Sequence, residues 1–171
     1  MKRIISVAAL LFIALMSVTQ PTLAQNDLWT FTGEEAQAQT QSTQANSAGV
    51  TLTEFKTVQA DLPALEGVLQ SAPLEFSGEN ATLTLPMPDS TFQSFTLMEA
   101  PVMEPELAAS LPDVKTYIVY GTDDPTATGS VSYTPLGFRA FIIGRDGTVV
   151  VTQAETDDMT EFVVYNDADV W

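Results

Sequence analysis

The sequence contains no cysteine and no histidine. Without these residues the chain cannot assemble a Ser-His or Cys-His nucleophile, and it lacks the usual nitrogen and sulfur ligands of zinc. No disulfide can stabilise the fold, and no cysteine can carry a lipid anchor. A phosphate-binding glycine loop and a G-x-S-x-G nucleophile motif are also missing. We therefore expect a protein that is not an enzyme and that uses neither a cofactor nor a metal.

Positive charge is scarce. The chain has 22 acidic residues and six basic ones. All the acidic residues follow Ala24, whereas only four basic ones do, so residues 25–171 carry a formal net charge of −18, which is four minus 22. A surface of this kind repels nucleic-acid phosphates and anionic lipids. We expect no nucleic-acid partner and no membrane partner after signal removal, and we prefer solubility to a specific cationic partner as the reason for the acidity.

The chain has one long hydrophobic run, and it lies at the N-terminus. Lys2 and Arg3 precede an almost unbroken apolar stretch over residues 4–18, and small residues lead to Ala24. This pattern predicts a signal peptide over residues 1–24, cleaved between Ala24 and Gln25, and hence a secreted or periplasmic protein. The alternative is an uncleaved anchor helix, but the run is shorter than the roughly 20 residues that span a bilayer.

Residues 25–50 are predicted to be a flexible linker. The stretch is rich in Gln, Thr, Ser and Ala, and such a composition buries too little apolar area to offset the entropy of ordering. It also contains Trp29 and Phe31, which have two interpretations. They dock onto the following domain as an extra strand, or they act as a recognition tag, and docking is the more common outcome.

A globular pattern begins at residue 51 and continues to residue 171. Asp61, followed by Pro63 and by apolar residues at helical spacing, predicts a short helix that ends near residues 71–73. A second short helix is expected over residues 105–111, before Pro112. The remaining segments alternate in polarity between turns that contain Gly, Pro or Asp, which predicts strands. We expect these strands at residues 52–60, 81–85, 92–99, 117–121, 131–133, 138–143, 149–151 and 161–165.

Short connections and the absence of a βαβ alternation predict an α+β, mainly β fold. We expect a single domain built as an antiparallel strand meander with two short helices. The opposite face of the strand 138–143 carries Arg139, Phe141 and Ile143 and is mostly apolar, so this strand is expected to be central and covered on both sides. The core face is expected to contain Val131, Tyr133, Phe138, Ala140, Ile142, Val149 and Val151.

Carboxylates are the one catalytic group left in the chain. The pairs Asp123-Asp124 and Asp157-Asp158 lie in predicted loops, where they could act as an acid and base or bind Ca²⁺ through their oxygens. Turn formation explains both pairs without any chemistry, because Asp side chains commonly bond to nearby backbone amides in turns. We prefer this structural interpretation, and we predict no catalytic, cofactor-binding or metal-binding residues.

Several short motifs in one order give the chain a family resemblance. Residues 54–165 resemble the N-terminal propeptide region of secreted bacterial reprolysin-like (adamalysin-type) zinc metalloproteases. The residues that mark the resemblance most clearly, all expected in structural roles, include Asp123, Asp124, Pro125, Thr126, Thr128, Pro135 and Gly137. The motifs are Leu85-Pro86-x-Pro88-Asp89, Glu99-Ala100-Pro101, Pro105-Glu106-Leu107, Asp123-Asp124-Pro125-Thr126-Ala127-Thr128 and Thr134-Pro135-Leu136-Gly137-Phe138.

The resemblance implies a non-catalytic prosegment whose partner is a zinc metalloprotease catalytic domain, which it helps to fold or covers until it is removed. The sequence departs from the family at Arg139, where the family often carries histidine, and at Gly129, where it tends to be apolar. It stops at Trp171, before any histidine-bearing catalytic domain, so the partner would act in cis within a longer precursor or in trans. Because there is no thiol to ligate the zinc, inhibition would be steric.

Two further interpretations stay open. The first is a secreted, acidic, β-rich binding or surface module with no connection to a protease. The second, much less favoured, is an enzyme that works through its paired carboxylates. Because a shared fold does not fix a function, the resemblance supports the prosegment interpretation by analogy.

Overall fold

The computed structural model describes residues 28–32, 44–45, 51–154 and 158–170. The predicted signal peptide with its cleavage site and most of the stretch 25–50 lie outside these residues. Within them, nine strands form one sheet, and a separate pair contains β2 and β3. The strands of the large sheet are β1 (Trp29–Phe31), β4 (Lys56–Ala60), β5 (Ala81–Pro86), β6 (Phe92–Glu99), β7 (Lys115–Gly121), β8 (Thr128–Thr134), β9 (Gly137–Gly144), β10 (Gly147–Gln153) and β11 (Glu161–Asn166). The other elements are β2 (Gln44–Ala45), β3 (Thr51–Leu52), the helices α1 (Leu62–Gln70) and α2 (Pro105–Ser110), and the 3-10 helix η1 (Asp167–Asp169).

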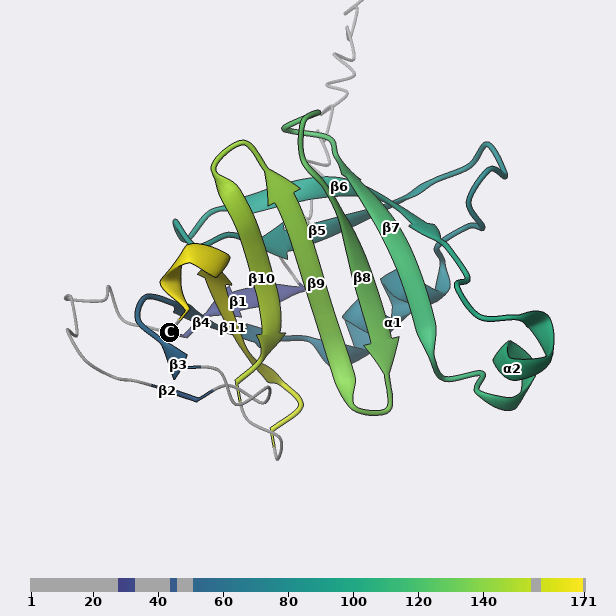
Figure 1. Cartoon of the computed structure of the whole chain (residues 1–171), viewed down its shortest axis with the longest axis horizontal. Helices are drawn as coiled ribbons and strands as arrows, with labels where there is room; N and C mark the ends of the chain where they lie inside the picture. The colour runs from purple at the N-terminus through teal and green to yellow at the C-terminus, as the bar shows by residue number, and fades with distance from the viewer. Residues whose placement is uncertain (1–27, 33–43, 46–50, 155–157, 171) are drawn as a thin grey trace, which may run out of the picture.

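The large sheet is an antiparallel meander. Its strand order is β1-β4-β11-β10-β9-β8-β7-β6-β5, so each strand from β5 to β10 pairs with the next one along the chain. Strand β4 then adds to β11, and β1 adds to β4. Figure 1 shows β7 to β10 as a front layer, with β5, β6 and β1 crossing behind it. The fold is therefore α+β and mainly β, in a single domain with two short α-helices, as predicted.

The two edge strands of the curled sheet, β1 and β5, approach each other. The indole Nε1 of Trp29 donates a hydrogen bond to the backbone oxygen of Thr84, at 2.8 Å. The rings of Phe31 and Phe92 lie close by, with centroids 5.1 Å apart. The expectation that Trp29 and Phe31 dock as an extra strand is therefore confirmed. Strand β1 belongs to the folded domain although it lies inside the stretch expected to be a linker.

Helix α1 begins at the cap that the sequence predicts. The side chain of Asp61 accepts a hydrogen bond from the backbone N–H of Ala64 at 3.0 Å, and a proline occupies the first turn. Leu65 and Leu69, four positions apart on one face, are buried in the core. The helix follows β4 directly and contacts β5, so it packs against the same interior that Trp29 enters (Figure 1).

The predicted strand over residues 52–60 is interrupted. A bend at residues 53–54 separates β3 from β4. The backbone N–H and the hydroxyl of Thr53 both donate to the backbone oxygen of Asp169, each at 2.9 Å. The bend therefore arises from contact with the C-terminal segment, which a local pattern could not indicate.

The core face that the sequence predicts is confirmed, but one neighbouring expectation is wrong. All seven expected residues belong to the main apolar cluster or pack against it. Strand β9 is central in the sheet, as expected. Its other face, however, is not covered among the described residues, because Phe141 is 41% exposed and Ile143 is 60% exposed. The apolar composition of both faces therefore did not indicate a strand buried on both sides.

A second, smaller apolar cluster lies on the outer face of β10 and β11. Its members are Leu52, Val150, Ala154, Val163 and Tyr165, with Phe55 packed against them. Leu52 of β3 and Phe55, which follows the bend, cover this part of the outer face. The neighbouring outer face over β7, β8 and β9 has no comparable apolar cluster in the described chain.

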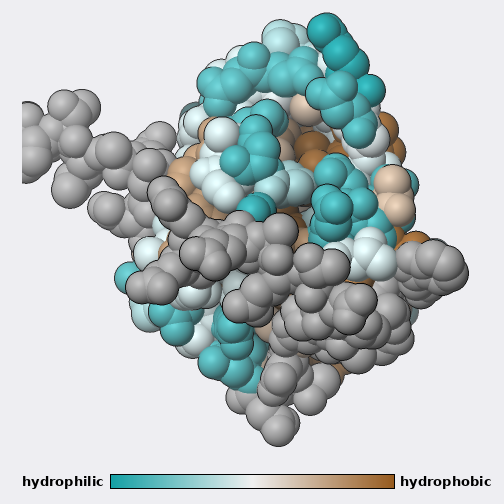
Figure 2. All heavy atoms as spheres, turned by 90° about the vertical axis from the view of Figure 1, so that its left-hand side faces the viewer, coloured by the Kyte–Doolittle hydropathy of each residue, from teal (hydrophilic) through white to brown (hydrophobic). Residues whose placement is uncertain are grey.

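On the side of the strands β10 and β11, the visible surface of the described residues is largely hydrophilic. Figure 2 shows polar side chains over most of the coloured surface on that side, with apolar areas only between them. The other feature of the periphery is α2, which projects at one end of the sheet and buries none of its side chains (Figure 1). A polar surface of this kind agrees with the large net negative charge of the chain.

Candidate functional site

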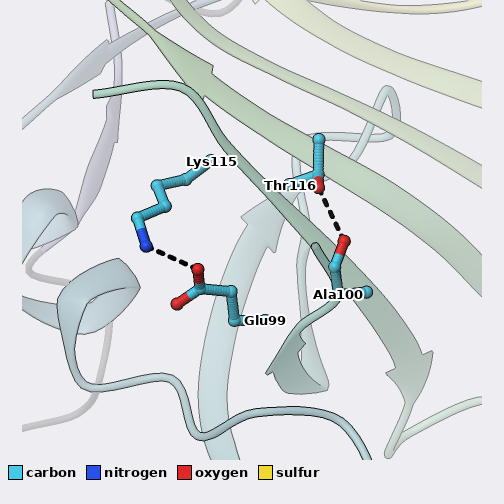
Figure 3. Close-up of polar contacts among 4 residues, drawn as sticks. All are labelled: Glu99, Ala100, Lys115 and Thr116. Atoms are coloured by element: carbon cyan, nitrogen blue, oxygen red, sulfur yellow. Dashed lines mark hydrogen bonds and ion pairs between the residues drawn. The ribbon is translucent and has the colours of Figure 1, made fainter. Parts of the chain in front are cut away.

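A cluster of polar side chains lies at one end of the sheet, on the same face as the core. It contains Glu66 of α1, Glu99 of β6, Lys115 and Tyr117 of β7, and Tyr133 of β8. The Nζ atom of Lys115 donates to Oε1 of Glu99 at 2.5 Å, the only ion pair found in the described part of the chain (Figure 3). The register pairs Glu99 with Tyr117 and Lys115 with Tyr133. The sheet therefore brings together charges from segments that are far apart in sequence.

The exit of β6 is fixed next to this ion pair. Beyond Glu99, the backbone N–H of Ala100 donates to the backbone oxygen of Thr116 at 2.9 Å. The hydroxyl of Thr116 donates back to the backbone oxygen of Ala100 at 2.6 Å (Figure 3). These two bonds extend the pairing of β6 and β7 by one residue beyond Glu99 and Tyr117. These contacts are structural, because they hold the end of β6 against β7.

The two tyrosines of the cluster are held in their neutral form. The hydroxyl of Tyr133 donates to Oε1 of Glu66. Burial, the hydrogen bond to Glu66 and its negative charge raise the pKa of Tyr133 to about 12. Burial and the charge of Glu99 likewise raise the pKa of Tyr117 to about 12. Both phenols therefore remain protonated near neutral pH, and that of Tyr133 donates its hydrogen bond to Glu66.

The raised pKa values predict a loss of stability in alkali. A phenol whose pKa rises from 10.0 in the unfolded chain to about 12 in the folded one contributes stability that is complete below pH 10. This contribution disappears as the pH rises from 10 towards 12. We expect urea denaturation over this interval to show a steady decline in the free energy of unfolding, and a shallower decline for Tyr117→Phe.

Tyr120→Phe is the matched control, because Tyr120 lies on the outer face of the same strand and is 44% exposed. This variant should decline with pH as the wild type does. A Tyr117→Phe protein whose decline equals that of the wild type would contradict the assignment. Tyr117, by contrast, is 4% exposed and lies on the core face of β7.

The predicted carboxylate pairs lie in turns and are far from each other. Asp123 and Asp124 follow β7, and Asp158 precedes β11, so the meander places them at opposite ends of the sheet. Asp157 lies outside the described residues. Within the described ranges no three acidic side chains come close enough to hold a metal ion. The structure therefore keeps the described aspartates of the two pairs apart.

Each described aspartate of these pairs accepts structural hydrogen bonds, and those of Asp124 and Asp158 are typical of turns. Oδ2 of Asp123 accepts from the backbone N–H of Ser94 at 2.7 Å, which ties the loop to β6. Oδ1 of Asp124 accepts from the hydroxyl of Thr126 at 2.7 Å and from its N–H at 2.9 Å. Asp158 makes the same two bonds with Thr160, at 2.7 and 2.8 Å.

These hydrogen bonds affect ionisation. The bonds from the hydroxyl and then the backbone N–H of Thr126 lower the pKa of Asp124, and those from Thr160 lower the pKa of Asp158. Both carboxylates are therefore charged acceptors at neutral pH. A general acid would need the opposite shift, towards neutrality.

The other residues that mark the resemblance also lie at the ends of β8. Pro125 and Thr126 form the turn after Asp124, and Thr128 begins the strand. Pro135 lies in the turn to β9, and Gly137 begins β9 with a φ of +118°. This φ favours glycine, and a Cβ atom there would also lie 2.2 Å from Oε1 of Gln153, so the end of that side chain would have to shift.

A second candidate site is a hollow on the outer face beside β6 and β7. It has a volume of about 370 Å³ and is open to solvent. We call it the Phe76 hollow, after the exposed aromatic residue of its lining. Its lining residues are Glu75, Phe76, Gly78, Glu79, Asn80, Thr96, Met98 and Tyr120.

Phe76 is held at the rim of this hollow in a strained conformation. Its side chain is 92% exposed, and its φ is +65°. A residue with a bulky side chain rarely adopts a positive φ, and such strain costs about 1–3 kcal/mol. Because the ring is exposed, burial of its apolar surface does not offset this cost. Strain that is maintained at an exposed side chain is typical of functional sites.

Backbone hydrogen bonds hold the loop of Phe76 against β6. The N–H of Glu75 donates to the oxygen of Glu99 at 2.8 Å, and the N–H of Glu99 donates to the oxygen of Pro73 at 2.7 Å. Leu74 forms a parallel bridge with Glu99 in the same place. The N–H of Ser77 then closes a turn onto the oxygen of Leu74 at 3.2 Å. The backbone position of Phe76 is therefore fixed by hydrogen bonds to Glu99, the residue that also pairs with Lys115.

Sequence reasoning missed Phe76. The signal that could have found it is an apolar residue inside the polar segment Glu75-Phe76-Ser77-Gly78-Glu79, between a helix and a strand. Another hollow, of about 310 Å³, is lined by Thr30, Gln59, Ala60, Asp61 and Thr160. It lacks aromatic side chains, and its one carboxylate caps α1, so it is a weaker candidate.

Comparisons with protein-family models, with curated proteins and with solved structures found no match. No helix in the described ranges is both long enough and apolar enough to cross a membrane.

Proposed function

We propose that the domain is a non-catalytic binding module. The observation that carries this proposal is Phe76, an aromatic side chain that is 92% exposed beside an open hollow, on a loop whose backbone is held by hydrogen bonds. Large, rigid aromatic side chains of this kind are common anchors of protein interfaces. The roles of the polar groups support the same proposal, because Asp124 and Asp158 accept turn hydrogen bonds, Asp123 ties its loop to β6, and the raised pKa values keep both cluster tyrosines neutral.

In its most specific form, the partner is the catalytic domain of a reprolysin-like zinc metalloprotease. The domain would help that catalytic domain to fold and would cover its cleft until removal. The support for this partner is the resemblance of residues 54–165 to the propeptide region of such proteases. Inhibition would be steric, because the chain has no cysteine to ligate the zinc.

A refolding and inhibition assay tests this form of the proposal. A reprolysin-like catalytic domain from the same source is denatured and then refolded with and without the purified domain. We expect a higher yield of active protease when the domain is present, or inhibition of the native protease at micromolar concentrations. The control is an unrelated acidic protein of similar size and charge, because a general effect of negative charge would be the same for both.

The alternative is a secreted, acidic, β-rich binding or surface module that acts on some other partner. The Phe76 hollow would serve this function equally well. If the domain shows neither refolding assistance nor inhibition in the assay above, the result favours the alternative.

We also propose that the chain is exported, with residues 1–24 removed as a signal peptide. The basic start, the apolar run and the small residues before Gln25 support this proposal. N-terminal sequencing of the exported protein should begin at Gln25. An exported chain that still begins at Met1 would overturn the proposal.

A further inference from the structure

We propose that the Phe76 hollow binds a polypeptide segment in which a lysine or arginine lies beside an apolar residue. This inference rests on the proposed function as a binding module and adds to it the place of binding and the chemistry of the partner. It is carried by three properties of the hollow, namely its apolar side chains, its fixed backbone and its one-sided charge.

The apolar part of the hollow extends over three elements. Phe76 stands on the loop before β5, Met98 on β6 and Tyr120 on β7, all on the outer face of the sheet. Tyr120 is 44% exposed, and Met98 is partly buried. Aromatic rings and a methionine together offer a soft, adaptable apolar contact for a side chain of a partner.

The hollow is already in place before any partner binds. The loop is anchored to β6 through Glu75 and Pro73, as described above, and Gly78 supplies a second positive φ of +83°. A prearranged surface loses little conformational entropy when it binds, which favours affinity. A backbone that keeps a phenylalanine at φ +65° in solvent has a purpose other than filling the core.

The charge of the hollow has one sign. Glu75 and Glu79 are its charged lining residues, and no base lines it. The four bases after residue 25 lie in other places. Lys115 is paired with Glu99, and Arg139 bonds to Thr152, while Lys56 and Arg145 belong to β4 and the turn after β9. The chain itself therefore places no cation in this hollow among the described residues.

A lysine or arginine side chain matches both features of the hollow at once. Its aliphatic stem packs on apolar surface while its charged head stays near water and carboxylates. A cation is also attracted to the faces of aromatic rings such as those of Phe76 and Tyr120. The large net charge of the chain is explained by solubility, so it is the local combination of two carboxylates with exposed aromatic rings that indicates a cationic partner.

The open shape indicates a polypeptide as the occupant. Sites for small molecules usually enclose most of their ligand, whereas this hollow is shallow and open to solvent. Anionic lipid would be repelled by Glu75 and Glu79. A segment of a protein can place one side chain in the hollow and extend along the surface on either side.

A peptide titration followed by nuclear magnetic resonance tests this proposal. The probe is a synthetic peptide, Gly-Ser-Leu-Lys-Leu-Ser-Gly, titrated into the isotope-labelled full chain without its signal peptide. The matched control peptide has glutamine in place of lysine. We expect saturable shifts of the backbone amides around Phe76, Thr96 and Tyr120. The lysine peptide should bind about threefold more tightly, with an advantage that shrinks as salt rises.

The decisive variant is Phe76→Asn. Asparagine is among the residues that tolerate a positive φ, so this change relieves strain while removing the ring. We expect the melting temperature to stay the same or rise, and the affinity for the lysine peptide to fall at least about tenfold. The control is Leu136→Ser, because Leu136 is 88% exposed in the turn between β8 and β9 and should not affect binding.

A charge variant separates the two parts of the interaction. In the double variant Glu75→Gln with Glu79→Gln, the lysine and glutamine peptides should bind equally, and the salt dependence should disappear. The proposal is overturned if Phe76→Asn leaves the affinity unchanged, if the shifts lie elsewhere, or if the wild type does not distinguish the two peptides.

Failure of this inference can be distinguished from failure of the proposed function. If the peptides do not bind at Phe76 but the domain still inhibits or refolds the protease, the binding surface lies elsewhere and only the inference fails. If the lysine peptide binds at Phe76 but the protease is unaffected, the inference stands and the protease partner is wrong.

Discussion

Replacing Trp29 with alanine lowers the free energy of unfolding by about 3–5 kcal/mol, the usual cost of truncating a fully buried large aromatic residue. Trp29 is 2% exposed, and its ring lies against those of Phe138 and Phe162 at centroid distances of 5.6 and 5.3 Å. Its Nε1 also bonds to the backbone oxygen of Thr84, so one side chain of β1 contacts β5 and the middle of the sheet. Urea denaturation followed by circular dichroism measures the loss.

Two further variants separate the contributions of Trp29. Trp29→Phe keeps most of the aromatic packing but leaves the oxygen of Thr84 without its donor, so it should cost about 1–3 kcal/mol. Thr30→Ala, on the exposed face of the same strand, should have little effect. If Trp29→Ala were no less stable than Thr30→Ala, β1 would not be part of the core.

The strand pattern of the domain could be predicted from sequence because turns and alternation are local. The hairpin of β5 and β6 and the meander from β7 to β11 follow the turn residues and the period of two, and they were found within a few residues of their ends. The inner face of β9 also follows from alternation. The prediction failed for the outer face of β9, because composition alone does not say whether another layer lies above Phe141 and Ile143.

The contacts that close the domain could not be predicted, since they join distant segments. Trp29 and Thr84 are 55 residues apart, and Glu66 and Tyr133 are 67 residues apart. In neither pair does the local sequence around one residue indicate that it contacts the other. The exposure of Phe76 was hidden for a related reason, because its strained φ depends on the bonds between its loop and Glu99. The turn roles of Asp124 and Asp158 were accessible because their partners lie two residues away.

Replacing Gly129 with valine should destabilise the domain by about 3 kcal/mol, although propensity alone favours valine in a strand. A Cβ atom at Gly129 would lie 2.1 Å from the backbone oxygen of Phe141 and 2.7 Å from Cδ1 of Ile142. The first of these contacts is with the backbone of β9, so it can be relieved only by moving β8 and β9 apart. This steric cost exceeds the gain from propensity, which is at most about 1 kcal/mol.

Ser130→Val is the matched control for Gly129→Val, because Ser130 is the next residue of β8 and lies on the exposed outer face. There the gain in propensity meets no steric cost, so thermal denaturation should show an unchanged or slightly higher melting temperature. A Gly129→Val protein as stable as the wild type would contradict this steric argument. It would mean that β8 and β9, which pair along residues 128–134 and 137–143, can move apart at little cost.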